Sequence, residues 1–358
     1  MDDTVTTPAV NWTQRVGAFT GLPALISALG LDATSTLQGA GLDVDELDDA
    51  TLRVSYHALG KLLDDIAKRS GCEHVGLLAG RMWHLADLGL VGELCRDSAT
   101  VRHALDALVF HQQLISEGGA MFVLDRAGWV DIGYAICCPG VIGANQISEA
   151  VIAAGFNYMR EMCGSAWRPT AVLFSHARPF NTSAHCSLFK DQPRFDAEYS
   201  ALRFPSDWLN RRVEGASPAR LRATQALAAS AAASAVRAGL VQRVYSALRI
   251  GLVTGDCSGD DVARQLSLHR RTLNRRLRVE GRTIQGMLDE MRFETAKQLL
   301  ARSRLSLDDV AAAVGYAGVT QFIRRFRRWS GISPGTWRRE AREARRLRSE
   351  LCTAVSNC

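Results

Sequence analysis

The sequence predicts an α+β N-terminal domain followed by an all-α domain in which two helix-turn-helix units are joined by a linker helix. A chain of 358 residues is about twice the length of a typical domain. Helical spacing of apolar residues is interrupted by a few β-rich runs in the N-terminal part and continues without such runs in the C-terminal part. The charge divides in the same way: residues 239–358 contain 23 Lys and Arg against 12 Asp and Glu, whereas residues 1–238 contain 20 against 25.

We expect four regions along the chain. We expect an N-terminal domain at residues 1–212, a helical connector at 213–238, the all-α domain at 239–340 and a charged tail at 341–358. The connector sequence ASPARLRATQALAASAAASAVRA is rich in alanine, which favours a helix over a flexible linker, although the same helix could serve as a dimer contact. A basic C-terminal part behind an acidic body is typical of a nucleic-acid-binding module attached to a domain with another task.

Five segments near the N-terminus show helical spacing: residues 22–31, 55–69, 75–83, 88–95 and 101–114. Gly30 and Gly71 favour helix ends after the first two segments. Asp87 and Thr100 are candidate N-caps for the last two, because their side-chain oxygens can accept hydrogen bonds from the first backbone N–H groups.

The periodicity changes after these helices. Residues 120–125 and 129–136 are rich in β-forming side chains, and the intervening Arg126-Ala127-Gly128 predicts a hairpin. A long helix is expected at 145–163, a strand at 170–175 and two further short strands within 193–204. Helices interrupted by a few strands indicate an α+β domain rather than alternating βαβ units.

The stretch LSLDDVAAAVGYAGVTQFIRRFRRWSGISPGTWRR, residues 305–339, predicts one helix-turn-helix. Ser306 is a candidate N-cap for its first helix, and Gly315 suits the left-handed conformation that ends it. The second helix has an apolar stripe of Phe322, Phe326 and Trp329. Between these residues lie four arginines: Arg324, Arg325, Arg327 and Arg328. A helix with one face in a core and a basic opposite face suits insertion into a major groove, whereas the alternative is a solvated basic face.

A second unit of the same kind precedes it. A helix at 260–266, a turn at 267–269 and a helix at 270–280 form the expected unit, with a further helix at 241–253 before it. The segment 284–300 predicts the linker helix that holds the two units at a fixed separation. In the second helix, Arg271 and Asn274 lie opposite the apolar face, where Arg can pair with guanine and Asn with adenine.

The segment 305–339 resembles the signature of the AraC/XylS family of transcription regulators. The resemblance rests on Val314-Gly315-Tyr316, on Phe322-Ile323-Arg324-Arg325-Phe326-Arg327 and on Gly331-Ile332-Ser333-Pro334, in the family's order and spacing. It implies two helix-turn-helix units that read successive major-groove segments of double-stranded DNA, in a promoter site of about two helical turns.

The expected DNA contacts come from both units. On the first unit they are Arg270, Arg271, Asn274 and Arg275, and on the second Val319, Thr320, Ile323, Arg324, Arg327 and Arg328. Val319 and Ile323 depart from the polar residues often found there, so contacts with thymine methyl groups would replace hydrogen bonds. The resemblance also implies a sequence-specific activator that contacts RNA polymerase, with a homodimer as a possible assembly.

The N-terminal part resembles the ligand-binding domain of one branch of this family over residues 20–210. The resemblance rests on GLVGELCRDSATVRHALDAL, on Trp167-Arg168-Pro169, on Pro193-Arg194-Phe195 and on Ala201-Leu202-Arg203-Phe204-Pro205. Where that branch commonly has Phe-Gly, this chain has Phe189-Lys190. The resemblance implies a small-molecule effector, and the aromatic, Met and Cys content favours a small, largely apolar molecule in an enclosed pocket. No ligand-binding residue is assigned from sequence, and Trp83, His84, His103 and His111 are expected to be core residues.

The cysteine content and the absence of targeting motifs argue against several other classes of protein. Nine cysteines without a C-x-x-C pair indicate reduced thiols rather than disulfides or a metal site. The polar N-terminus and the lack of a long apolar run predict no signal peptide, no membrane association and a cytoplasmic protein. We expect no cofactor and no catalytic residue. A cysteine-dependent DNA-repair enzyme using the same DNA-binding module is the alternative, through Cys186 beside His185 or through Cys137-Cys138. A non-specific architectural DNA binder is a third possibility.

Overall fold

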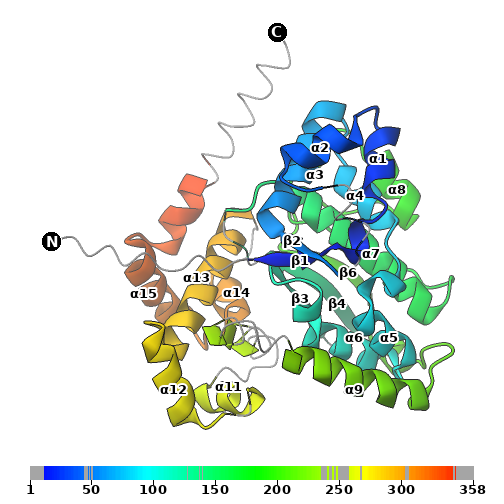
Figure 1. The fold of residues 1–358 in the computed structure, drawn as a ribbon. Coiled ribbons are helices and arrows are strands. Elements are labelled where there is room, and N and C mark those ends of the chain that lie inside the picture. The colour runs from blue at the N-terminus through cyan, green and yellow to red at the C-terminus, as the bar shows by residue number, and fades with distance from the viewer. Residues whose placement is uncertain are drawn as a thin grey trace.

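The computed structural model describes residues 12–43, 47, 49, 51–126, 128–136, 138, 140–234, 240–241, 244–245, 247–248, 258–266, 268–302, 306–341 and 343. Its N-terminal part mixes helices with two antiparallel sheets (Figure 1). The small sheet pairs β1 (Thr13–Arg15) with β2 (Arg53–Ser55). The larger sheet has the order β3-β4-β6-β5 and consists of β3 (Gly119–Arg126), β4 (Trp129–Ile136), β5 (Ala171–Leu173) and β6 (Ser200–Pro205).

Helices surround these sheets. They are α1 (Leu22–Ala28), α2 (Ala33–Gly39), α3 (Tyr56–Ser70), α4 (Val75–Arg81), α5 (Leu90–Asp97), α6 (Val101–Phe110), α7 (Ala144–Cys163), α8 (Ser183–Phe189) and α9 (Pro218–Ser234). Short 3-10 turns connect them at η1 (Val16–Phe19), η3 (Leu85–Leu88), η4 (Gln112–Leu114) and η5 (Ser206–Asn210). The central helix is α7, which packs against α3 and α4 and also against β4 and β6. One continuous apolar core therefore runs from the helices through α7 to the sheet.

Glycines allow α4 and α7 to approach at backbone distance. A Cβ atom on Gly76 would lie 1.9 Å from the carbonyl oxygen of Gln146, and one on Gly80 would lie 2.0 Å from that of Ala150. Backbone atoms cannot move aside as a flexible side chain can. The small residues of α4 therefore fix the position of α7 in the core.

The helix α9 is docked on the N-terminal part rather than free in solvent (Figure 1). The carboxylate of Asp97, at the end of α5, accepts hydrogen bonds from the Arg220 guanidinium at 2.6 to 3.0 Å and from the Ser217 backbone N–H at 3.1 Å. These contacts, the Arg220 hydrogen bonds foremost, hold the pKa of Asp97 below its ordinary value. The first turns of α9 are thus tied to α5 by a carboxylate that stays ionised.

The C-terminal part is helical and has two separate cores. Its helices are α11 (Gly259–Gln265), α12 (Arg270–Val279), α13 (Ile284–Arg302), α14 (Leu307–Ala313) and α15 (Val319–Ser330), with further helical residues at 334–341. The first half of α13 contributes Met287 and Leu288 to a core shared with α11 and α12. The second half contributes Ala296 and Leu300 to a core shared with α14 and α15. One helix therefore belongs to both cores.

Most of the long elements expected from sequence are confirmed. The hairpin, the long helix α7 and the helices of the C-terminal part lie within a few residues of the expected bounds. Thr100 caps α6 by accepting a hydrogen bond from the His103 N–H, and Gly71 ends α3 in a left-handed conformation. Most of the helix expected at 241–253, most of the tail at 341–358, and residues 235–238 of the connector lie outside the described residues.

Two expectations about these elements were wrong. Asp87 does not cap α5: its side chain closes the capping box of η3, and Gly89 precedes α5. Residues 193–204 supply only one strand, β6, because residue 194 makes just an isolated bridge to β5. The short elements β1, β2, α2 and α8 were not expected from the sequence. None of the described helices is both long enough and apolar enough to span a bilayer.

Adding a methyl group between α4 and α7 tests their close packing. We expect Gly80→Ala to lower the free energy of unfolding by about 1 to 3 kcal/mol, because overpacking displaces backbone in a filled core. Gly39→Ala, in α2, is the control, since a Cβ atom there meets nothing within 4 Å. Urea unfolding of both variants measures the difference. Equal stabilities for the two variants would show that α4 and α7 can separate without cost.

Neutralising Asp97 tests the docking of α9. We expect Asp97→Asn to raise amide hydrogen exchange in residues 218–224 at neutral pH, because the charge-assisted hydrogen bonds to Arg220 are lost. In the unchanged chain the same release should begin only as the pH falls below about 4, since a lowered carboxyl pKa stabilises above the unfolded-state value and loses this effect in acid. Asp106→Asn, at an exposed position of α6, should leave this exchange unchanged.

Candidate nucleic-acid interface and candidate ligand cavity

The exposed face of α15 gathers most of the residues expected on the second unit. Phe322 and Phe326 are completely buried and fix the opposite face in the core. Five of the expected contact residues line one shallow hollow on the surface: Thr320, Ile323, Arg324, Arg327 and Arg328. Three guanidinium groups around an open hollow form a site suited to a polyanion.

Two apolar residues of α15 lie partly in the core. Val319 and Ile323 are both partly buried and pack against the core of α14 and α15. Arg325 lies on the side of α15 that faces α13 and forms an ion pair with Asp289 of that helix, with 3.6 Å between nitrogen and oxygen. The basic stripe therefore divides into arginines that face solvent and one that fastens α15 to α13.

The expected residues of the first unit lie on α12. Leu273 and Leu277 are buried, so Arg271 and Arg275 point outward and are exposed, while Asn274 is half-buried. Arg270 is engaged within the protein, because its Nη1 lies 2.6 Å from a carboxylate oxygen of Asp260 in α11. An anion that contacted Arg270 would have to compete with this carboxylate.

Polar contacts on α13 orient both helix pairs. Glu290 accepts hydrogen bonds from Tyr245 at 2.5 Å and from Arg282 at 2.9 Å. Arg292 donates to the carbonyl oxygen of Gly315 at 3.1 Å and lies over the ring of Tyr316. The second contact holds the turn between α14 and α15, where Gly315 has φ of 75°. The helix α13 therefore positions the turn that precedes α15 as well as its core.

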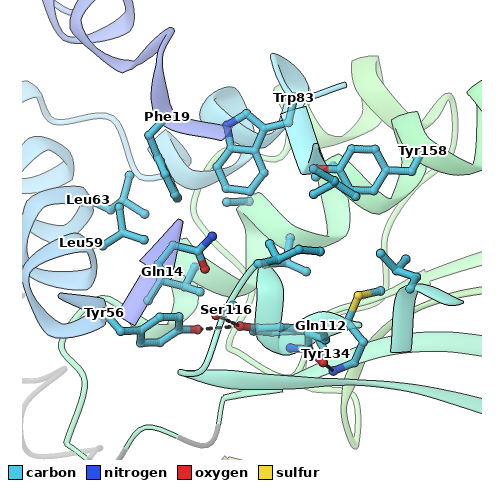
Figure 2. Close-up of a pocket in the computed structure, with 18 residues that line it drawn as sticks. Gln14, Phe19, Tyr56, Leu59, Leu63, Trp83, Gln112, Ser116, Tyr134 and Tyr158 are labelled. Atoms are coloured by element: carbon cyan, nitrogen blue, oxygen red, sulfur yellow. Dashed lines mark hydrogen bonds between the residues drawn. The ribbon is translucent and has the colours of Figure 1, made fainter. Parts of the chain in front are cut away.

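The N-terminal part contains a cavity of about 60 Å³ between α3, α7 and the hairpin of β3 and β4 (Figure 2). None of its lining side chains carries a formal charge. They are Gln14, Phe19, Tyr56, Leu59, Leu63, Trp83, Leu88, Leu108, Gln112, Ile115, Ser116, Met121, Tyr134, Ile147, Ala150, Val151, Ala154 and Tyr158. This volume is several times the roughly 10–15 Å³ that one water molecule requires.

Four polar side chains of the cavity lie close together. The hydroxyl groups of Tyr56 and Tyr134 share a hydrogen bond of 3.0 Å, and Ser116 Oγ lies 3.4 Å from the Tyr134 hydroxyl. Figure 2 shows these groups opposite Phe19 and Trp83. The Gln112 amide is bonded to the backbone of β3, donating to Gly119 at 2.6 Å and accepting from the residue-121 N–H at 2.5 Å.

Glycines make room for the two tyrosine rings. A Cβ atom on Gly118 would lie 2.2 Å from the Tyr56 ring, and one on Gly119 would lie 2.2 Å from the Tyr134 ring. The start of β3 therefore forms a flat support for both rings. Across the cavity, burial raises the pKa of Tyr158 well above its ordinary value, so this group stays neutral.

The sequence assigned no cavity residue, and it placed two histidines wrongly in the core. Trp83 is buried and lines the cavity, but His84 and His103 are exposed rather than core residues. His84 lies at the N-cap of η3 and pairs with Glu161 at 3.1 Å. The cavity residues come from distant segments whose apolar spacing is that of any core helix, so only the fold brings them together.

Two of the five described cysteines, Cys95 and Cys138, are buried, and the other three are half-buried. The five described cysteines are free thiols, and burial raises the pKa of Cys95 and of Cys163 to about 12, so both stay protonated at neutral pH. His185 is fully buried and bonded to Glu149 at 3.0 Å, which ties α8 to α7 instead of activating Cys186. Cys138 is buried 3.5 Å from His57, and Cys137 lies outside the described residues.

A family model described as the arabinose-binding domain of AraC transcription regulators matches residues 30–213, and a helix-turn-helix domain model matches residues 262–340. The chain belongs to the AraC family of transcription regulators. The N-terminal match contains the whole set of helices and strands around the cavity except the segment before α2. The helix-turn-helix match extends from within α11 to the end of the helical residues after α15.

Relatives of this AraC-family chain are regulators. It is 27% identical over 323 residues to the HTH-type transcriptional regulator VirS of Mycobacterium tuberculosis, covering 89% of this chain and 94% of the relative. It is 26% identical over 319 residues to the ornithine utilization regulator of Pseudomonas aeruginosa, covering 88% and 93%. The transcriptional activator NphR of Rhodococcus is 32% identical over 117 residues, 33% of this chain and 35% of that protein. These matches confirm a regulator and exclude the enzyme alternative.

Proposed function

We propose that this AraC-family regulator binds a specific promoter sequence through two helix-turn-helix units, α11 with α12 and α14 with α15. The observation that supports this most directly is that α13 belongs to the cores of both units. Because each half of one continuous helix is fixed in a different core, α12 and α15 keep a constant separation. A rigid pair suits two successive major-groove segments, about 34 Å apart on one side of B-DNA.

The proposed base contacts follow the exposed faces of these helices. On α12 we assign Arg271, Asn274 and Arg275, with Arg270 joining them once it leaves Asp260. On α15 we assign Thr320, Arg324, Arg327 and Arg328, with Val319 and Ile323 offering only the part of each side chain outside the core. A non-specific architectural binder would need basic residues alone, so Asn274 and Thr320 beside the arginines favour sequence reading.

We further propose that an effector bound in the N-terminal domain controls an activator. The N-terminal domain is 1–212, the connector 213–238 and the DNA-binding domain 239–340 in this proposal. The name of NphR, an activator that is similar over 117 residues, a third of this chain, supports activation, which would include contact with RNA polymerase. A homodimer through the exposed side of α9 is compatible with the same function.

Two of the contacts between the halves offer routes of communication. The connector begins as α9, which Asp97 fastens to α5. The second route is a contact between aromatic rings: Trp12, directly before β1, lies 6.4 Å from Tyr245 of the basic part. Tyr245 is bonded to Glu290 of α13, and Gln14 of β1 lines the cavity. We propose that a change at the cavity reaches α13 through one or both of these contacts.

Alanine variants separate base reading from general attraction. We expect Arg271→Ala, Asn274→Ala and Arg324→Ala each to cost about 1 to 3 kcal/mol in binding to the preferred site and to relax the preference at one base pair. The measurement is selection of binding sites from a random DNA library, followed by titration of the full chain with the selected and mutated sites.

Arg222→Ala is the matched control, because this exposed arginine lies on α9. It should leave both affinity and base preference unchanged. If the three variants lost affinity equally for every DNA sequence, the assignment of α12 and α15 as reading helices would be wrong. If the unchanged chain selected no preferred sequence, the proposal of a specific regulator would fail.

A further inference from the structure

We propose that the cavity lined by Tyr56, Tyr134 and Trp83 is the effector site and that it takes a small uncharged molecule with an apolar chain or ring and one hydroxyl or carbonyl oxygen. The inference rests on the proposed effector control, and it adds the location, the orientation and the chemical class of the ligand. The family model carries the name of a sugar. The uncharged and mostly apolar lining of the cavity suits a less polar molecule than a sugar.

The lining excludes a charged ligand. All eighteen lining side chains are uncharged, so no Lys, Arg or His could pair with a buried carboxylate or phosphate and no Asp or Glu with a buried amine. An ion moved from water into such surroundings loses its hydration without compensation. A carboxylate would bind here only after it took up a proton.

The lining also argues against a sugar. A pentose presents polar oxygens around its whole ring, and each buried oxygen needs a hydrogen-bond partner. The walls formed by Phe19 and by Ala150 and Ala154 of α7 offer only carbon surface. Hydroxyl groups placed against these walls would lose their bonds with water and gain nothing in return.

One side of the cavity does provide for a single polar atom. The hydroxyl groups of Tyr56, Tyr134 and Ser116 already form a chain with gaps of 3.0 and 3.4 Å. A hydroxyl group both donates and accepts, so a ligand hydroxyl or carbonyl oxygen can join this chain by a change of partners. The ligand would therefore lie with its oxygen at these three groups and its apolar body towards Phe19 and Trp83 (Figure 2).

Trp83 marks the access route. It lines the cavity and also a second hollow at the surface, which is formed by Thr20, Gly21, Leu22, Ala79, Met82, Trp83, His84 and Asp87. Its ring meets Phe19 edge to face at 4.8 Å, while its backbone carbonyl is held by the Asn157 side chain at 3.0 Å. A turn of this one side chain would connect the two spaces and enlarge the cavity without moving the backbone.

Calorimetric titration of the full chain with three small probes tests the inference. The probes are 1-hexanol, hexanoate and L-arabinose at neutral pH. We expect saturable binding of 1-hexanol, at least tenfold weaker binding of hexanoate, and no binding of L-arabinose at the same concentrations. Tryptophan fluorescence should change on addition of 1-hexanol, and Trp83→Phe should abolish most of that change.

Variants locate the binding. Ala154→Phe fills the cavity and should weaken 1-hexanol binding at least tenfold, whereas Ala219→Phe, exposed on α9, should leave it unchanged. Tyr134→Phe removes one hydroxyl group and should weaken it about fivefold, the effect of one hydrogen bond. Thermal unfolding establishes that each variant is folded. If Ala154→Phe fails to fold, the nearly isosteric Tyr134→Phe still carries the test.

Four results would overturn the inference: no saturable binding of 1-hexanol, equal binding by a folded Ala154→Phe variant, equal binding by the Tyr134→Phe variant, or binding of hexanoate or L-arabinose as tight as that of 1-hexanol. The proposed DNA-binding function is judged separately, by DNA titration without any probe. Loss of probe binding with intact sequence preference contradicts the cavity assignment alone. Probe binding in a chain that shows no DNA sequence preference contradicts the proposed function alone.

Discussion

The helix α13 is the constraint on which the DNA-binding half depends. Its 19 residues span about 28 Å at the rise of an α-helix. Met287 and Leu288 near one end and Leu300 near the other are buried in different cores, so neither helix pair can rotate without disturbing α13. The ion pair of Asp289 with Arg325 and the bond of Arg292 to Gly315 add polar restraints at the middle of the helix. A single rigid element thus sets the distance and the relative orientation of two basic faces.

In the N-terminal half, close backbone packing fixes the relative positions of the helices and the sheet. Gly76 and Gly80 bring α4 onto α7, while Gly118 and Gly119 let two tyrosine rings lie flat on the start of β3. The helix α7 then forms one wall of the cavity, and the tyrosine hydroxyl groups form part of the opposite side. Because β1 contributes Gln14 to this cavity and Trp12 beside it touches Tyr245, the cavity and α13 are only a few contacts apart. This proximity gives effector binding a short physical path to the DNA-binding half.

The sequence predicted the long, strongly periodic elements well, because spacing alone identifies a buried face on helices such as α7, α13 and α15. The helix N-caps Ser306 and Thr100 were also predicted from the sequence, and each side chain accepts a hydrogen bond from a backbone N–H three residues ahead. The short strands β1 and β2 were missed, since three residues cannot display a period and their pairing is set by distant partners. Asp87 was misread because it lies inside a 3-10 turn, η3, where its side chain bonds back to the His84 backbone N–H.

The two candidate sites differed in how far they could be foreseen. The residues proposed to contact DNA lie on single helices, so that local spacing separates the buried Phe322 from the exposed Arg324. The engagement of Arg270 by Asp260 and of Arg325 by Asp289 depends on packing between helices and was not predictable. The cavity depends on packing even more, because its polar side joins Tyr56, Ser116 and Tyr134 from three separate segments. No local pattern distinguishes such residues from ordinary core residues.

Hydroxyl-radical footprinting of the full chain on its selected DNA site tests most directly whether α13 holds two reading helices together. If it does, the backbone should be protected in two patches about one helical turn, roughly 10 base pairs, apart on one side of the duplex, and both should appear at the same protein concentration. A single protected patch, or two patches that fill at clearly different concentrations, would contradict the rigid two-unit arrangement.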